Sequence, residues 1–199
     1  MNAAAAGDGR RRLRVATWNI HKGVRGIGPG KRLEIHNLGQ GVQQLKADLV
    51  MLQEVRLFHH REARRFAHGA QAWPTQGQAE FLAPSGWHSA YRTNAVTRHG
   101  EHGNAIISRW PLGEIGHRDV SDHRFEQRGL LHVPVHCAGV AVHAVVAHLG
   151  LIHSSRVRQV EQLLRFIDEE VPAGLPLIVG GDFNDWGCSA NSESRRSPQ

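Results

Sequence analysis

Residues 175–186, LPLIVGGDFNDW, join a short apolar run to a polar end, and they decide how the rest of the chain is interpreted. The apolar part, bounded by proline and glycine, has the composition of a buried β-strand. Asp182 and Asn184 follow it directly. Because a strand ends at one edge of its sheet, we expect this strand to deliver both polar side chains to a reaction centre.

Other segments are also typical of β-strands, with turn-forming residues between them. Residues 48–55, DLVMLQEV, are apolar almost throughout, as in a strand covered on both faces. Together with the run above, the expected strands are residues 13–19, 48–55, 87–91, 103–109, 114–120, 129–135, 139–150 and 175–180.

Two helices are predicted by apolar residues spaced three and four apart. Strands followed by a helix and a further strand predict one α/β (α+β) domain over residues 12–186, in which sheet packs on sheet and helices lie outside. The apolar faces expected are Ile35, Leu38, Val42 and Leu45 on the first helix, and Val157, Val160, Leu164, Ile167 and Val171 on the second.

The charge balance favours anionic partners. Lys and Arg number 24 against 18 Asp and Glu, a net charge of +6 with neutral histidines. A positive field attracts phosphodiesters and nucleic acid, although a composition biased towards arginine explains the excess equally well. The basic stretch 59–69, HHREARRFAHG, is interpreted as a solvated face, with a phosphate-attracting rim as the alternative.

The two cysteines, Cys137 and Cys188, form no C-x-x-C pair, so neither a zinc site nor a disulfide scaffold is expected. A cytoplasmic monomer is the expectation, with no segment apolar enough for a signal peptide or a membrane span. Residues 1–11 are expected to form a flexible lead-in.

Four polar residues each extend an apolar face at the C-terminal end of a predicted strand. Along a strand, residues two apart share a face. Counted in this way, Asn19 continues the face of Leu13 and Val15, Glu54 that of Val50 and Leu52, His148 that of Val142 and Val146, and Asp182 that of Ile178.

One such residue is explained by a polar cap, but four of this chemistry predict a shared site. Burial of amide, imidazole and carboxylate groups costs several kcal/mol unless they bond to each other or to an ion. Carboxylates with an amide form an oxygen-rich site of the Mg²⁺ type, here beside a histidine able to bind phosphate. The absence of cysteine from this set argues against structural zinc.

The motifs TWNIHKG, MLQEV, GNAIISRWP, EQRG, AHLG and GGDFNDW, in this order, resemble the endonuclease/exonuclease/phosphatase superfamily. This superfamily includes type I deoxyribonuclease, apurinic endonucleases, inositol polyphosphate 5-phosphatases and sphingomyelinases. The resemblance spans residues 13–186, and the NIHKG and AHLGL forms are similar to small bacterial cytoplasmic members of unassigned substrate. It implies a four-layer α/β/β/α sandwich of two mostly antiparallel sheets.

The resemblance also implies roles for the residues gathered above. Glu54 matches the principal Mg²⁺ ligand, with Mn²⁺ as an alternative metal, and Asn19 lies beside the metal and the scissile phosphate. His148 matches a donor to a non-bridging phosphate oxygen. Asp182 matches the residue that orients or deprotonates the attacking water, and Asn184 matches one that holds the phosphate or the nucleophile in line.

Three further positions carry weaker expectations. Arg128 in EQRG matches a phosphate contact of some branches, the alternative being a solvated arginine. Asn104 and Tyr91 are expected to pack or to cap loops.

This sequence departs from the superfamily after GDFN, where members carry a further aspartate strand and a final Ser-Asp-His. Neither fits after Asn184, so the fold is expected to lack its last strands and residues 187–199 to be disordered. Ser121-Asp122-His123 occurs earlier, between two β segments, and is interpreted as a coincidence of composition. Hydrogen-bond reach between His123 and Asp182 tests that interpretation.

Two hypotheses follow. The first is Mg²⁺-dependent hydrolysis of a phosphodiester or phosphomonoester by in-line attack of an activated water, with DNA or RNA as the preferred substrate. The alternative is a catalytically inactive, truncated remnant that at most binds metal, phosphate or nucleic acid.

Overall fold

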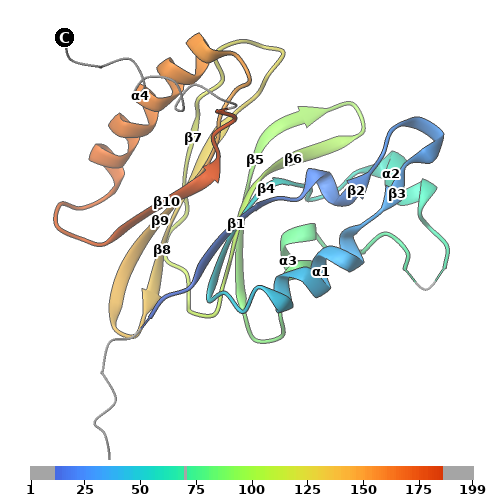
Figure 1. The fold of residues 1–199 in the computed structure, drawn as a ribbon, viewed down its shortest axis with the longest axis horizontal. Helices are drawn as coiled ribbons and strands as arrows, with labels where there is room; N and C mark the ends of the chain where they lie inside the picture. Colours follow the sequence, from blue (N-terminus) through green and yellow to red (C-terminus); the bar gives the residue numbers. More distant parts are fainter. Residues whose placement is uncertain (1–11, 70, 186–199) are drawn as a thin grey trace, which may run out of the picture.

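The computed structural model describes residues 12–69 and 71–185. Within this part, two four-stranded sheets pack face to face and helices cover their outer surfaces (Figure 1). The first sheet has the order β1-β4-β6-β5, with β1 Val15–Asn19, β4 Leu49–Val55, β6 Gly100–Ser108 and β5 His88–Thr97.

The second sheet has the order β10-β9-β8-β7. A small third sheet pairs β2 with β3 beside the first one. The bounds are β7 Gly116–Asp119, β8 Gly129–Cys137, β9 Val140–His148 and β10 Leu177–Asp182, with β2 Val24–Arg25 and β3 Arg32–Leu33 in the small sheet.

Four α-helices and two short 3-10 helices connect these strands in the described part of the chain. None of the described helices is long and apolar enough to cross a membrane. The bounds are η1 His21–Gly23, η2 Gly28–Gly30, α1 Ile35–Gln44, α2 His60–Arg65, α3 Gln78–Leu82 and α4 His153–Glu170.

The α/β class and the predominance of antiparallel pairing are confirmed. Among the pairs of the two large sheets, β1 with β4 and β9 with β10 are parallel, and the others are antiparallel. The predicted lead-in 1–11 and tail 187–199 lie outside the described residues, as does Trp186.

Three apolar layers hold the four structural layers together. The first lies between α1, α3 and the first sheet, where Val42, Leu82 and Leu52 pack together. The second lies between the two sheets, and the third joins α4 to the second sheet. The chain therefore folds as the expected α/β/β/α sandwich.

The predicted apolar face of α4 is wrong. The helix buries Ser155, Gln159, Leu163 and Phe166, whereas Val157, Val160 and Leu164 are exposed. The buried polar side chains are used by loops: the Ser155 hydroxyl donates to Asp122 Oδ2 (2.6 Å) and Gln159 Oε1 accepts from Gly150 N (2.8 Å). These tertiary hydrogen bonds, which helical periodicity does not register, set the rotation of α4.

Candidate active site

The C-terminal ends of four strands meet where the two sheets face each other. Each parallel pair places two strand ends side by side: Asn19 is in register with Gln53, and Asp182 with His148. Asn19 Nδ2 donates to Asp182 Oδ2 at 2.9 Å and lies 3.4 Å from Glu54 Oε1. The side chain of Asn19 thus joins a carboxylate of one sheet to a carboxylate of the other.

His148 completes this group from β9. Its Nε2 lies 3.9 Å from Asp182 Oδ2, and the residue is 4% exposed. His148 lies on the same face of β9 as Ala144 and Val146, which pack in the layer between the sheets, as the alternation of side chains predicts. The strand-end residues Asn19, Glu54, His148 and Asp182 are therefore brought together.

Glu54 reaches this group by a route that alternation does not predict. Val50 and Leu52, whose face Glu54 was expected to share, pack against α1 and α3 on the outer side of the sheet. The pairing of β4 with β6 shifts register between Leu52 and Val55, and Glu54 has a positive φ of 55°. This β-bulge turns Glu54 towards Asn19.

Left-handed backbone is concentrated at the site. Besides Glu54, the non-glycine residues His21 (φ 47°), Lys22 (φ 64°) and Asn184 (φ 49°) adopt it. Such conformations cost of order 1–3 kcal/mol each and persist where the surrounding structure imposes them. The fold thus holds strained backbone on three segments that border the same position.

Charges of both signs face each other here. Burial opposes ionisation of Glu54, but the Lys22 ammonium, 3.1 Å from Glu54 Oε2, outweighs it and holds the pKa of Glu54 below its usual value. Burial, followed by the positive charge of Arg128, lowers the pKa of His148 to about 4. At neutral pH the site therefore presents a carboxylate and a neutral imidazole.

Asn184 and Arg128 converge on a backbone carbonyl beside the group. Asn184 Nδ2 donates to Leu149 O (2.8 Å), and Arg128 Nε donates to the same oxygen (3.0 Å). Arg128 also donates to Glu126 Oε1 at 2.9 Å, so it is not the solvated arginine of the alternative interpretation. Both side chains border the site and are held by β9 and its loop.

Two residues of the site were missed from the sequence. Lys22 lies in η1, which directly follows β1, three residues beyond Asn19. A lysine so close to a predicted site residue was an available signal. His102, on β6, interacts electrostatically with Lys22 and Glu54, and burial lowers its pKa to about 4. No local pattern marks His102, because only the pairing of β6 with β4 brings it near.

The tripeptide Ser121-Asp122-His123 does not contribute to the group. Asp122 accepts from Arg158 Nε (2.7 Å), which anchors its loop to α4. Within the described residues, His123 Nε2 faces Glu126 Oε2 at 3.7 Å and makes no hydrogen bond to Asp182. The geometry therefore agrees with a coincidence of composition.

Asn104 and Tyr91 have structural surroundings. Asn104 is fully buried and donates to Gly129 O at 2.8 Å, which ties the first sheet to the second. Tyr91 packs against the layer between the first sheet and its helices. Both agree with the packing role expected of them.

The donor set suits a hard divalent cation held with few protein ligands. No group of three or more His, Cys, Asp or Glu able to hold a metal occurs in residues 12–69 and 71–185. Mg²⁺ commonly uses one or two carboxylates, with water and substrate oxygens as the other ligands. Glu54 offers one such carboxylate, and its Oε2 lies 3.1 Å from the Lys22 ammonium.

Comparison with known proteins places this chain in a family. The model of the Endonuclease/Exonuclease/phosphatase family matches residues 16–198, so the chain belongs to that family. It is 38% identical over 182 residues to the uncharacterized protein YbhP of Escherichia coli K12, covering 90% of this chain and 69% of that protein.

Solved structures share the fold at low sequence identity. A family protein from Leptotrichia buccalis superposes with a TM-score of 0.63 at 13% identity, covering 87% of this chain and 68% of that one. D. rerio TDP2, complexed with single strand DNA product, gives a TM-score of 0.56 at 18% identity, covering 86% and 60%. These likenesses concern the fold alone.

Proposed function

We propose that this protein hydrolyses a phosphoester with the help of a divalent metal, Mg²⁺ or Mn²⁺, by in-line attack of water. The observation that carries the proposal is the 2.9 Å hydrogen bond from Asn19 to Asp182, which unites the polar ends of the two sheets beside Glu54 and His148. The membership of the chain in a family named for nucleases and phosphatases supports this reaction class.

In this proposal Glu54 and Asn19 hold the metal, which supplies charge neutralisation at the phosphate when bound. Asp182 accepts from Asn19 Nδ2 and from Asn184 N (3.1 Å), so its carboxylate is fixed in orientation. An oriented carboxylate accepts a proton from water at one of its oxygens and aligns the water for attack.

The remaining residues stabilise the phosphate. A neutral His148 retains one ring N–H to donate to a non-bridging oxygen, and burial strengthens that interaction. Arg128 lies close enough to His148 to affect its titration and adds positive charge at the same edge. Asn184 positions the strand end that carries Asp182.

We propose nucleic acid as the substrate of a cytoplasmic monomer. The net charge of +6 supports an anionic polymer. A binding protein without turnover is the second candidate, since no histidine of the described residues hydrogen-bonds Asp182 and His148 stands 3.9 Å away. Hydrolysis assays separate the two.

The test compares the wild type with Glu54→Gln and Asp182→Asn on bis(p-nitrophenyl) phosphate and on an oligonucleotide, with Mg²⁺ or Mn²⁺. We expect kcat/KM to fall about 100-fold or more in both variants, because each removes a group acting on metal or water. EDTA should abolish turnover of the wild type.

Asp168→Asn is the matched control, since Asp168 is an exposed carboxylate on α4. It should retain wild-type activity. Equal rates in the wild type and both site variants would leave the binding protein as the better account.

A further inference from the structure

Two neighbouring hollows lead away from the candidate site. The first, of about 560 Å³, begins at Asn19 and Glu54 and extends past β2 to Lys31 and Arg56. The second, of about 320 Å³, continues from the same Lys31 and Arg56 to Arg61 on α2. Lys31 and Arg56 line both hollows, so the two hollows are neighbours, and together they are hereafter called the basic groove.

Cationic side chains dominate this groove. Its carboxylates are already engaged: Glu54 with Lys22, Glu34 with Asn37, and Glu62 with two cations. Six cations and three carboxylates line the groove, so the groove as a whole carries net positive charge. The cations that line it are Lys22, Arg25, Lys31, Arg56, Arg61 and Arg65.

A buried carboxylate organises the middle of the groove. Glu62 is 3% exposed, pairs with Arg56, and lies 2.8 Å from Lys31 Nζ. Burying Glu62 without partners would be costly, so this pairing fixes two cations in place. Burial, followed by the charges of Arg56, Arg65 and Arg61, lowers the pKa of Lys31, a sign of crowded positive charge that a bound anion would relieve.

Two arginines of the groove are available to a ligand. Arg25 and Arg61 are exposed, and neither guanidinium group makes a hydrogen bond or an ion pair with the described residues. Arg65, in contrast, donates to Gly28 O (2.8 Å) and Pro29 O (2.6 Å), which holds the η2 loop against α2. The groove thus combines a fixed wall with unpartnered guanidinium groups.

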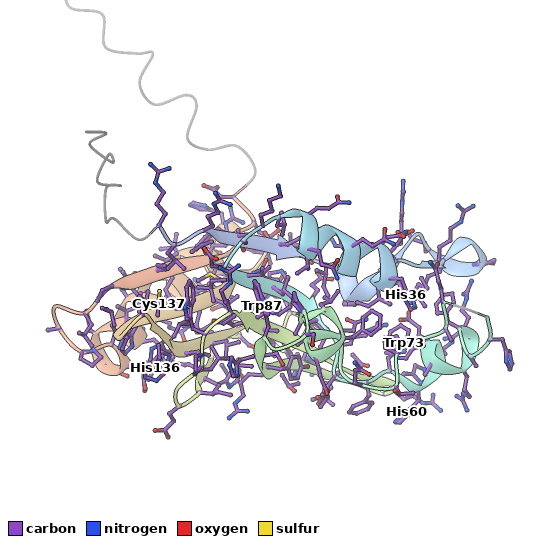
Figure 2. The ribbon with its side chains drawn as sticks, turned by 90° about the horizontal axis from the view of Figure 1, so that it is seen from below. His36, His60, Trp73, Trp87, His136 and Cys137 are labelled. Carbon is purple, nitrogen blue, oxygen red and sulfur yellow. The ribbon has the colours of Figure 1, made fainter. Side chains whose placement is uncertain are left out.

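Aromatic rings accompany the cations at this end of the molecule. Trp73 faces the Arg56 guanidinium at 6.0 Å, and Figure 2 shows Trp73 and His60 at the same end, far from His136 and Cys137. Phe58 is 42% exposed and contacts His60, with the two rings tilted and their centroids 5.0 Å apart. An exposed aromatic ring such as that of Phe58 is a surface on which unstacked bases bind.

We propose that the basic groove binds the phosphates of a single-stranded nucleic acid that extends from the site at Asn19 and Glu54 towards Arg61. Placing the cleaved phosphate at Asn19 and Glu54 rests on the proposed function. Binding of the nucleic acid in the groove does not depend on hydrolysis. A single strand is preferred to a duplex because it enters a hollow and exposes its bases to the rings.

The test measures binding of fluorescein-labelled dT12 by anisotropy, in EDTA, to the full chain. Arg25→Gln and Arg61→Gln should each raise Kd about threefold to tenfold and reduce the slope of log Kd against log salt by about 0.7. Arg14→Gln is the control: it removes an exposed arginine near Lys46 and Arg109, at the opposite, N-terminal ends of β1 and β4. This control should leave Kd and the slope close to the wild-type values.

Hydrolysis provides the second readout. Arg61→Gln should raise KM for dT12 and leave kcat/KM for bis(p-nitrophenyl) phosphate unchanged, because the small diester does not reach Arg61. A chain that binds dT12 with the expected variant pattern but hydrolyses neither substrate would refute the proposed function and support the groove.

Three results would overturn the groove proposal. The first is an equal effect of Arg14→Gln and Arg61→Gln on dT12 binding. The second is tighter binding of a twelve-base-pair duplex than of dT12. The third is loss of binding to phosphatidylglycerol vesicles in Arg61→Gln while dT12 binding is intact, which would indicate a membrane surface instead.

Discussion

Gly181 shows at the scale of one residue why the strand before Asp182 carries two glycines. A Cβ at Gly181 would overlap the backbone carbonyl of Ala147 on β9, whereas a Cβ at Gly180 would meet the sulfur of Met51 on β4. Backbone cannot move out of the way without breaking the pairing of β10, but a methionine side chain can adopt another rotamer. The two glycines thus allow β10 to pair closely with β9 and to pack closely against β4 of the first sheet, which positions Asp182.

Alanine at each glycine tests this difference. We expect Gly181→Ala to lower the free energy of unfolding by about 3 kcal/mol or more, and Gly180→Ala by about 1 kcal/mol. Urea unfolding followed by circular dichroism measures both. Equal losses in the two variants would contradict the close approach of β10 to β9.

At the scale of the element, the apolar spacing that predicts α4 differs from the set of residues that α4 buries. Leu163 is 5% exposed and packs with Phe166 against the second sheet, whereas Leu164 is 57% exposed. The apolar spacing that predicts the helix includes Leu164 and omits Leu163. Adjacent leucines of the same helix therefore distinguish the predicted face from the observed one.

Truncating each leucine gives a matched pair of measurements. Leu163→Ala should destabilise the protein by about 2–5 kcal/mol, because it removes buried methyl groups and leaves a cavity. Leu164→Ala should cost less than about 0.5 kcal/mol. If chemical denaturation ranked the two in the opposite order, the burial of α4 described above would be refuted.

At the scale of the whole molecule, buried histidines couple folding to pH. Burial, followed by the charge of Arg56, lowers the pKa of His59 to about 4, and burial lowers the pKa of His132 as well. In the unfolded chain histidine titrates near pH 6.5. Between about pH 6.5 and 4 the unfolded state therefore binds protons that the folded state does not, and acid favours unfolding.

We expect the melting temperature to be highest above about pH 6.5 and to fall as the pH is lowered towards 4. His132→Gln should lessen this fall, because it removes one buried group that takes up a proton on unfolding. His68→Gln, which changes an exposed histidine, should not. Calorimetry from pH 7.5 to 5 measures the effect, and a melting temperature that rises on acidification would contradict it.

The sequence by itself determined the order and type of the main elements and placed Asn19, His148 and Asp182 at strand ends, each on the apolar face of its strand. Alternation of side chains is a local property of extended backbone, so it can be read from residues close in the chain.

The tertiary structure alone decided three things: the direction in which the Glu54 side chain points, the position of His102 near Lys22 and Glu54, and the face that α4 buries. Glu54 turns towards Asn19 through a bulge whose register depends on β6. The rotation of α4 depends on hydrogen bonds from its buried polar residues to Asp122 and Gly150. Each of these outcomes is set by partners distant in sequence, and no local periodicity records them.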